Sequence, residues 1–134
     1  MEDNNGKWRF TSPTHVTHAF YQALIELESE DGITGRYKRY SENQRILAEG
    51  IEKLGSKILI PAELQAPIIS TFDYPSAPDY EFKKFYDLLK SDGFILYPGK
   101  LAQADCFRIG NIGEIYPNDI KRLLLAIEKN MYWV

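Results

Sequence analysis

The side chain with the clearest chemical potential is Arg108, in the segment DCFRIGNIG at residues 105–113. Read as a strand, this segment places Phe107 and Ile109 on one face and Cys106 and Arg108 on the other. The first face suits a core, and a guanidinium on the second suits bidentate contact with a carboxylate or phosphonate. An arginine on a strand is more often solvated or salt-bridged, so the residues alone leave both interpretations open.

A second position suited to an anion is the segment that contains Thr11 and Ser12, followed by Pro13 and Thr14. Ser12 as N-cap and Pro13 as the first helical residue predict the start of a helix. Free N–H groups and the positive dipole end at such a start bind anions readily. Plain helix capping explains the same residues and is the interpretation that the residues alone favour.

The remaining reactive side chains indicate structural or surface roles. His15 and His18 share a helix face, but no third metal ligand or H-E-x-x-H pattern accompanies them. Lys100 follows a Pro-Gly turn and is interpreted as solvated, and Cys106, the single cysteine, as a small buried or half-buried filler. Glycine-rich nucleotide loops and the G-x-S-x-G pattern are absent, so nothing in the chain predicts bond chemistry by itself.

Composition predicts one domain with a true core, because the 134 residues are 44% hydrophobic and 13% aromatic. The net charge of −3 argues against a nucleic-acid partner, and the basic cluster Arg36, Lys38 and Arg39 is interpreted as a solvated helix face. No apolar run approaches the ~20 residues of a membrane span. The polar N-terminus is unlike a targeting peptide, so a cytoplasmic location is expected.

Hydrophobic spacing predicts helices that alternate with short strands. The predicted helices are 13–30, 33–54, one around 82–90 and one from 117 onward, and the predicted strands are 57–60, 66–74, 94–97 and 104–109. This order indicates an α/β or α+β fold, a small mixed or antiparallel sheet covered by helices. The two leading helices are long for so small a body, and their outer faces are expected to lack a partner.

Four segments closely resemble 2-aminoethylphosphonate–pyruvate transaminases, which are pyridoxal-phosphate enzymes of the fold-type-I aminotransferase class. These segments are GKWRFTSPTH at 6–15, SENQR at 41–45, YPGK at 97–100 and CFRIGNIGE at 106–114. The resemblance runs from about residue 1 to Trp133 and covers only the last third or so of such an enzyme. It implies that residues 1–134 form the C-terminal small domain, with a helical lead-in at 13–54.

The resemblance also implies roles for particular residues. Arg108 corresponds to the arginine that binds the acidic group of the substrate. Thr11 corresponds to the threonine that reaches across a homodimer to the pyridoxal phosphate of the neighbouring subunit, with Ser12, Trp8 and Arg9 beside it. The lysine that forms the Schiff base is expected to lie outside this chain, so the chain alone is expected to bind no pyridoxal phosphate covalently and to be inactive.

The implied reaction moves an amino group from 2-aminoethylphosphonate to pyruvate and yields phosphonoacetaldehyde and alanine. The cofactor acts as the electron sink, and the protein supplies orientation and charge complementarity. No nucleic acid or membrane is expected as a partner. The alternative is a stand-alone, non-catalytic binding or dimerisation module that acts with a separate catalytic chain, which the two unpartnered leading helices suggest.

Overall fold

The computed structural model describes residues 6–7, 10–99 and 105–134, and it divides the chain into two compact units. The N-terminal unit comprises residues 1–36, and the C-terminal unit comprises residues 37–134. The elements are α1 (Thr14–Ser29), α2 (Gly32–Lys53), β1 (Ile69–Asp73), α3 (Phe82–Ser91), β2 (Tyr97–Pro98), β3 (Cys106–Gly110) and α4 (Pro117–Lys129). Within the described ranges, no helix is both long and apolar enough to cross a bilayer.

Helix α1 has no buried residue within its own unit. Its apolar side chains include Val16, Phe20 and Leu24, which are 69%, 63% and 45% exposed. A helix in water gains most of its stability by burying such a stripe against another element. Within residues 1–36, helix α1 therefore presents an exposed apolar stripe, and the absence of a partner for it stays a prediction.

The turn between the first two helices follows the predicted punctuation. Asp31 and Gly32 both adopt left-handed backbone angles, with φ of 61° and 67°, and this conformation ends α1. Arg36 folds back over the turn and pairs with Glu30 at 2.8 Å, so its interpretation as a solvated basic residue is wrong. The pair joins the end of α1 to the start of α2 across the turn.

The sheet has three antiparallel strands in the order β1-β3-β2, so β3 is central. The antiparallel form of the predicted sheet is confirmed. The predicted strand at 57–60 is reduced to one bridge between Ile58 and Phe72, because Pro61 follows and has no N–H group to extend a ladder. The predicted strand at 94–97 is also too long, since the Phe94 N–H bonds to Leu89 O at the end of α3.

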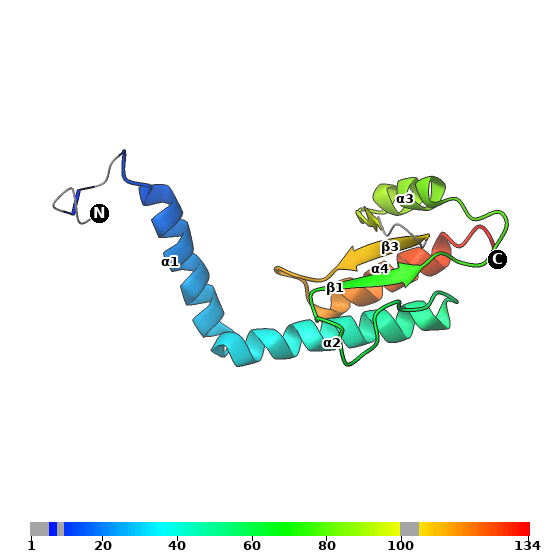
Figure 1. The fold of residues 1–134 in the computed structure, drawn as a ribbon, viewed down its shortest axis with the longest axis horizontal. Coiled ribbons are helices and arrows are strands. Elements are labelled where there is room, and N and C mark those ends of the chain that lie inside the picture. Colours follow the sequence, from blue (N-terminus) through cyan, green and yellow to red (C-terminus); the bar gives the residue numbers. More distant parts are fainter. Residues whose placement is uncertain (1–5, 8–9, 100–104) are drawn as a thin grey trace. The chain divides into compact units, whose positions relative to one another are not determined.

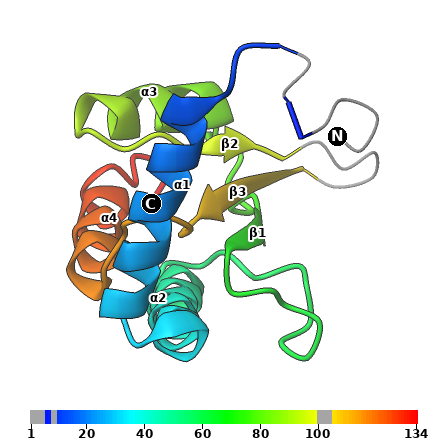
Figure 2. The same ribbon diagram turned by 90° about the vertical axis from the view of Figure 1, so that its left-hand side faces the viewer.

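The core lies on one face of the sheet, the face of Phe72, Phe107 and Ile109, which are at most 3% exposed. Helices α2, α3 and α4 all lie on this side (Figures 1 and 2). The buried core side chains that come from these helices and from the segment before β2 are Leu47, Ile51, Phe85, Leu89, Leu96, Ile120, Leu123, Ala126 and Ile127. Within the C-terminal unit as described, no helix covers the opposite face (Figure 2).

The helix ends of the C-terminal unit match the predicted stop and start signals. Gly55 and Gly93 have φ of 93° and 89° just after α2 and α3, where a left-handed residue closes a helix. Helix α4 starts at Pro117, and Asp119 accepts a hydrogen bond of 3.1 Å from the N–H of its N-cap Tyr116. These local signals fix where each helix meets the sheet.

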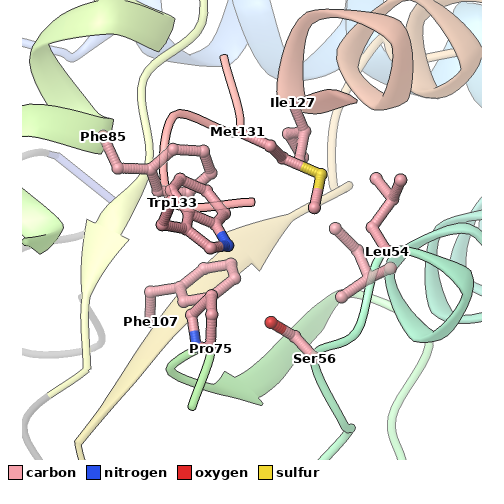
Figure 3. A pocket seen from close by; sticks show the side chains of 9 residues that line it. Leu54, Ser56, Pro75, Phe85, Phe107, Ile127, Met131 and Trp133 are labelled. Atoms are coloured by element: carbon pink, nitrogen blue, oxygen red, sulfur yellow. The ribbon is translucent and has the colours of Figure 1, made fainter. Parts of the chain in front are cut away.

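Aromatic rings fasten the end of the chain to the core beneath β3. Trp133 packs edge-on against Phe85 with ring centroids 5.2 Å apart, and Phe85 packs in turn on Phe107 at 5.9 Å. The cavity among these rings, Leu54 and Ser56 holds about 10 Å³, roughly the space of one water (Figure 3). It is therefore a packing gap beneath the sheet and too small for a substrate.

Candidate functional site

Arg108 occupies the middle of the uncovered face of the sheet. Its side chain is half-buried, and Nη2 donates a long hydrogen bond of 3.3 Å to Pro98 O. The Nε–H group is buried and has no partner among the described residues. An unsatisfied buried donor costs about 1–3 kcal/mol. An oxyanion in front of the strand would satisfy several of the five guanidinium donors at once.

Thr71 on β1 and Tyr97 on β2 lie directly opposite Arg108, one on each side. Residues opposite each other in antiparallel strands project from the same face. Asn111 N donates to Ile68 O, so these two residues form a hydrogen-bonded pair of the β1–β3 ladder. Hydrogen-bonded and non-hydrogen-bonded pairs alternate along antiparallel strands, which makes Thr71–Arg108, three pairs further along, a non-hydrogen-bonded pair. Side chains approach most closely in pairs of this kind. The strands therefore place two hydroxyl-bearing side chains on the same face as Arg108, one on each side of it. The sequence could not indicate this row, because it depends on the pairing register.

Cys106 belongs to the same face but is 1% exposed. Gly99 covers it, since a Cβ at that glycine would collide with the Cys106 sulfur and come within 2.5 Å of its carbonyl oxygen. The thiol is free and buried, in agreement with its interpretation as a filler. A thiol buried in this way is a poor nucleophile, so it adds packing rather than reactivity.

A polar clamp from α2 holds the loop that follows β3. Arg39 donates hydrogen bonds to Gly113 O at 2.8 Å and Ile115 O at 2.6 Å, and Asn43 donates to Ile115 O at 2.7 Å. The Arg39 guanidinium also lies 4.8 Å from the centre of the Tyr116 ring. The interpretation of Arg39 as part of a solvated basic face is therefore wrong, because the loop carbonyls and this ring surround it.

Asn111 fixes the start of the same loop. It is fully buried, and its side-chain amide donates to Pro67 O at 2.9 Å and to Tyr40 O at 3.3 Å. One amide thus joins the segment before β1, helix α2 and the end of β3. Because Asn111 is three residues from Arg108, this anchor also limits how far the arginine strand can shift.

Thr11 and Ser12 are exposed and precede α1 in the N-terminal unit. The predicted Ser12 N-cap is wrong: Pro13 occupies the N-cap position, with no side-chain cap, and Ser12 O accepts a 2.8 Å bond from Thr14 N. The helix begins one residue late because the backbone of Ser12 is used in this short turn. Its hydroxyl and that of Thr11 are therefore not consumed by capping. The N–H of Thr14 is used in this turn, whereas those of His15 and Val16 lack an intrahelical acceptor.

These hydroxyls and N–H groups fit a phosphate group, whether the phosphate is free or part of a cofactor. Thr11 and Ser12 belong to the N-terminal unit, and Arg108 belongs to the C-terminal unit. Trp8, Arg9 and Lys100, which the sequence also singled out, lie outside the described residues.

His15 and His18 are exposed and line a shallow hollow on α1 with Thr14, Ala19 and Gln22. In the part of the chain that the structure describes, no group of three or more histidine, cysteine or acidic side chains could hold a metal ion. The surface interpretation of this histidine pair agrees with its position.

No protein-family model matches the chain, but curated relatives do. It is 59% identical over 133 residues to the 2-aminoethylphosphonate–pyruvate transaminase of Vibrio cholerae, and 60% identical over 133 residues to that of Vibrio vulnificus. The match to the Salmonella heidelberg transaminase is 56% over 134 residues. The chain spans 36% of the length of each of these relatives. The predicted resemblance to the C-terminal portion of such transaminases is thereby confirmed.

Solved structures share the fold. Alanine–glyoxylate aminotransferase from Nostoc matches 96% of this chain and 34% of its own with a TM-score of 0.84 at 21% identity. Pyridoxamine–pyruvate aminotransferase from Mesorhizobium loti matches 80% of this chain and 28% of its own with a TM-score of 0.68 at 16% identity. The predicted fold class, a small sheet covered by helices as in fold-type-I aminotransferases, is confirmed.

Proposed function

We propose that this chain is the C-terminal small domain, with its helical lead-in at 13–54, of a 2-aminoethylphosphonate–pyruvate transaminase. The observation that carries the proposal is the 59% identity to such a transaminase over 99% of the chain. The geometry supports it, because Arg108 lies on the uncovered sheet face and its Nε has no partner among the described residues. A guanidinium in that position can bind the phosphonate of 2-aminoethylphosphonate and the carboxylate of pyruvate, since both are oxyanions.

In the proposed enzyme each residue has a limited task. Arg108 binds and orients the acidic group of the substrate, so that the reacting end points toward the catalytic centre. Thr11, with Ser12 beside it, donates hydrogen bonds to the phosphate of pyridoxal phosphate in the neighbouring subunit of a homodimer. When bound, the cofactor supplies the electron sink for amino transfer. The lysine that anchors the cofactor belongs to the rest of the enzyme, so the 134-residue chain alone is inactive.

The test places this sequence at the C-terminus of the Vibrio cholerae transaminase, in place of the 133 residues that it matches. This joined enzyme should transfer amino groups from 2-aminoethylphosphonate to pyruvate, while the 134-residue chain with pyridoxal phosphate should not. In the joined enzyme, Arg108→Ala should lower kcat/KM for both substrates. The loss should correspond to about 2–5 kcal/mol of transition-state binding free energy, as when a buried charge loses its partner. The control is Arg45→Ala, which removes a surface arginine paired with Glu49.

Two results would overturn the proposal. One is a joined enzyme that is folded and binds pyridoxal phosphate but transfers no amino group. The other is an Arg108→Ala enzyme with unchanged kcat/KM for both substrates. The role of Thr11 has its own measurement, since Thr11→Val should raise the Kd for pyridoxal phosphate and leave the KM for pyruvate within about threefold, given the loss of one charge-assisted hydrogen bond.

A second candidate function is a non-catalytic module that binds or dimerises with a separate catalytic chain. The exposed apolar stripe of α1 favours it, because Val16 and Phe20 are 69% and 63% exposed. The coding DNA upstream of Met1 discriminates between the two. A continuous reading frame that carries the lysine region favours the transaminase, and a separate reading frame for that region favours the module.

A further inference from the structure

The uncovered sheet face presents three polar side chains in one row across the strands, in the order Thr71, Arg108, Tyr97. Each comes from a different strand, and the register puts them directly opposite one another. Neither hydroxyl has a hydrogen-bond partner among the described side chains and backbone. Tyr97 is 57% exposed, so its hydroxyl is available to a ligand placed on Arg108.

The two proposed substrates differ in the number of oxygens that they offer. A carboxylate has two coplanar oxygens, which one guanidinium fork satisfies through two parallel N–H···O bonds. A phosphonate is tetrahedral and has three oxygens, so a fork leaves at least one oxygen without a protein donor. A hydroxyl next to the fork can donate to that third oxygen. On a carboxylate held in the plane of the fork, the same hydroxyl meets only the remaining lone pairs of oxygens that the guanidinium already binds.

We infer that Thr71 and Tyr97 are further binding residues, whose hydroxyl groups donate to the third oxygen of a phosphonate held by Arg108. The pair thereby sets the preference for a phosphonate over a carboxylate at this face, an inference that rests on the proposed function. Thr71 approaches from β1, where the non-hydrogen-bonded register brings it closest to Arg108, and Tyr97 approaches from β2. Together with the guanidinium they offer a tetrahedral group donors from three neighbouring strands.

The experiment uses the joined enzyme with the conservative variants Thr71→Val and Tyr97→Phe, which remove a hydroxyl and retain the side-chain shape. Each should lower kcat/KM for 2-aminoethylphosphonate about tenfold, the effect of one hydrogen bond to a charged group, and change kcat/KM for pyruvate less than about threefold. The inhibition constant of methylphosphonate should rise by the same factor, and that of acetate should stay unchanged. Tyr86→Phe on α3, whose side chain packs against the core, is the matched control.

The outcomes separate this inference from the proposed function. If Arg108→Ala impairs both substrates while Thr71→Val and Tyr97→Phe leave the phosphonate constants unchanged, the proposed function stands and this inference is wrong. An equal loss for 2-aminoethylphosphonate and pyruvate in either variant also overturns it, because a selective contact must distinguish three oxygens from two. A loss confined to 2-aminoethylphosphonate and methylphosphonate supports it.

Discussion

Arg39 on α2 donates a 2.6 Å hydrogen bond to the carbonyl oxygen of Ile115, a residue 76 positions later in the chain. The same Nη1 group lies 2.8 Å from Gly113 O. Helix α2 thus holds the loop that connects the arginine strand β3 to helix α4. A shift of this loop would displace the carboxyl end of β3, and with it Arg108.

The first prediction concerns this clamp. Arg39→Met retains most of the aliphatic length and removes the charged donors, so Gly113 O loses its bond from Arg39 and Ile115 O keeps only the bond from Asn43. Hydrogen bonds from charged groups contribute about 1.5–3 kcal/mol, and we expect the free energy of unfolding to fall by about that amount in urea titrations. Arg45→Met is the control: its surface pair with Glu49 contributes about 0.3–0.5 kcal/mol. Equal losses in the two variants would contradict the clamp.

Arg39 also shows where prediction from sequence stops. Its helix, α2, could be predicted from spacing that repeats every three or four residues, because that signal is local. Its partners could not, since carbonyl groups 74 and 76 positions away carry no side-chain signature. The same reason applies to the binding row. The alternation along residues 106–109 predicted the face of Arg108 correctly, but Thr71 and Tyr97 depend on strand register, which a single sequence leaves open.

The second prediction compares Tyr80 and Tyr132, two tyrosines whose rings pack against Trp133. The Tyr80 hydroxyl is buried with no partner among the described residues, and burial raises its pKa strongly. The Tyr132 hydroxyl instead accepts from Glu81 N at 2.8 Å and donates to Glu81 O at 2.9 Å. Removal of an unpaired buried hydroxyl should stabilise the fold, and removal of a paired hydroxyl should destabilise it.

We therefore expect Tyr80→Phe to raise the free energy of unfolding by about 1 kcal/mol and Tyr132→Phe to lower it by about the same amount. Thermal unfolding of the two variants beside the unmodified chain measures both effects. The two substitutions delete the same atom from the same ring, so each serves as the control for the other. A loss of stability in Tyr80→Phe would mean that its hydroxyl has a partner in solution, such as an ordered water.

The third prediction concerns acid. A hydrogen bond from Lys129 Nζ, at 2.8 Å, lowers the pKa of Asp92, and a second from Asn130 at 2.6 Å adds to the effect. Because the folded pKa lies below the unfolded value of about 3.9, the carboxylate contributes stability that is complete above that pH. This contribution is lost as the pH falls through the folded pKa of Asp92.

Asp92→Asn should therefore be less stable than the unmodified chain at neutral pH, and the difference should shrink below about pH 4. Urea titrations from acid to neutral pH measure it, and the carboxyl chemical shift of Asp92 reports its pKa directly. Asp79→Asn, on the exposed loop before α3, is the control for the removal of a surface carboxylate. A difference that stays constant across this range would show that Asp92 acts through packing and not through its charge.

The fourth prediction tests the close contact between β3 and the residue that follows β2, Gly99. Gly99 N donates to Cys106 O at 2.9 Å, and a Cβ at Gly99 would lie 2.5 Å from that oxygen and 2.8 Å from the carbonyl carbon. These atoms belong to the backbone of the central strand and cannot move aside. Gly99→Ala should therefore push β2 away and lower the free energy of unfolding by about 1–3 kcal/mol, the range for overpacking.

Displacement of β2 should also carry Tyr97 away from Arg108, so Gly99→Ala in the joined enzyme should weaken methylphosphonate inhibition more than acetate inhibition. Gly110→Ala provides the matched control on β3, because the nearest atom to its added Cβ is Ile68 O at an ordinary 3.9 Å. That variant should change stability by less than about 1 kcal/mol, and alanine there can even stabilise by restricting the unfolded chain. Equal effects of the two substitutions would mean that β2 is not held against β3 at Gly99.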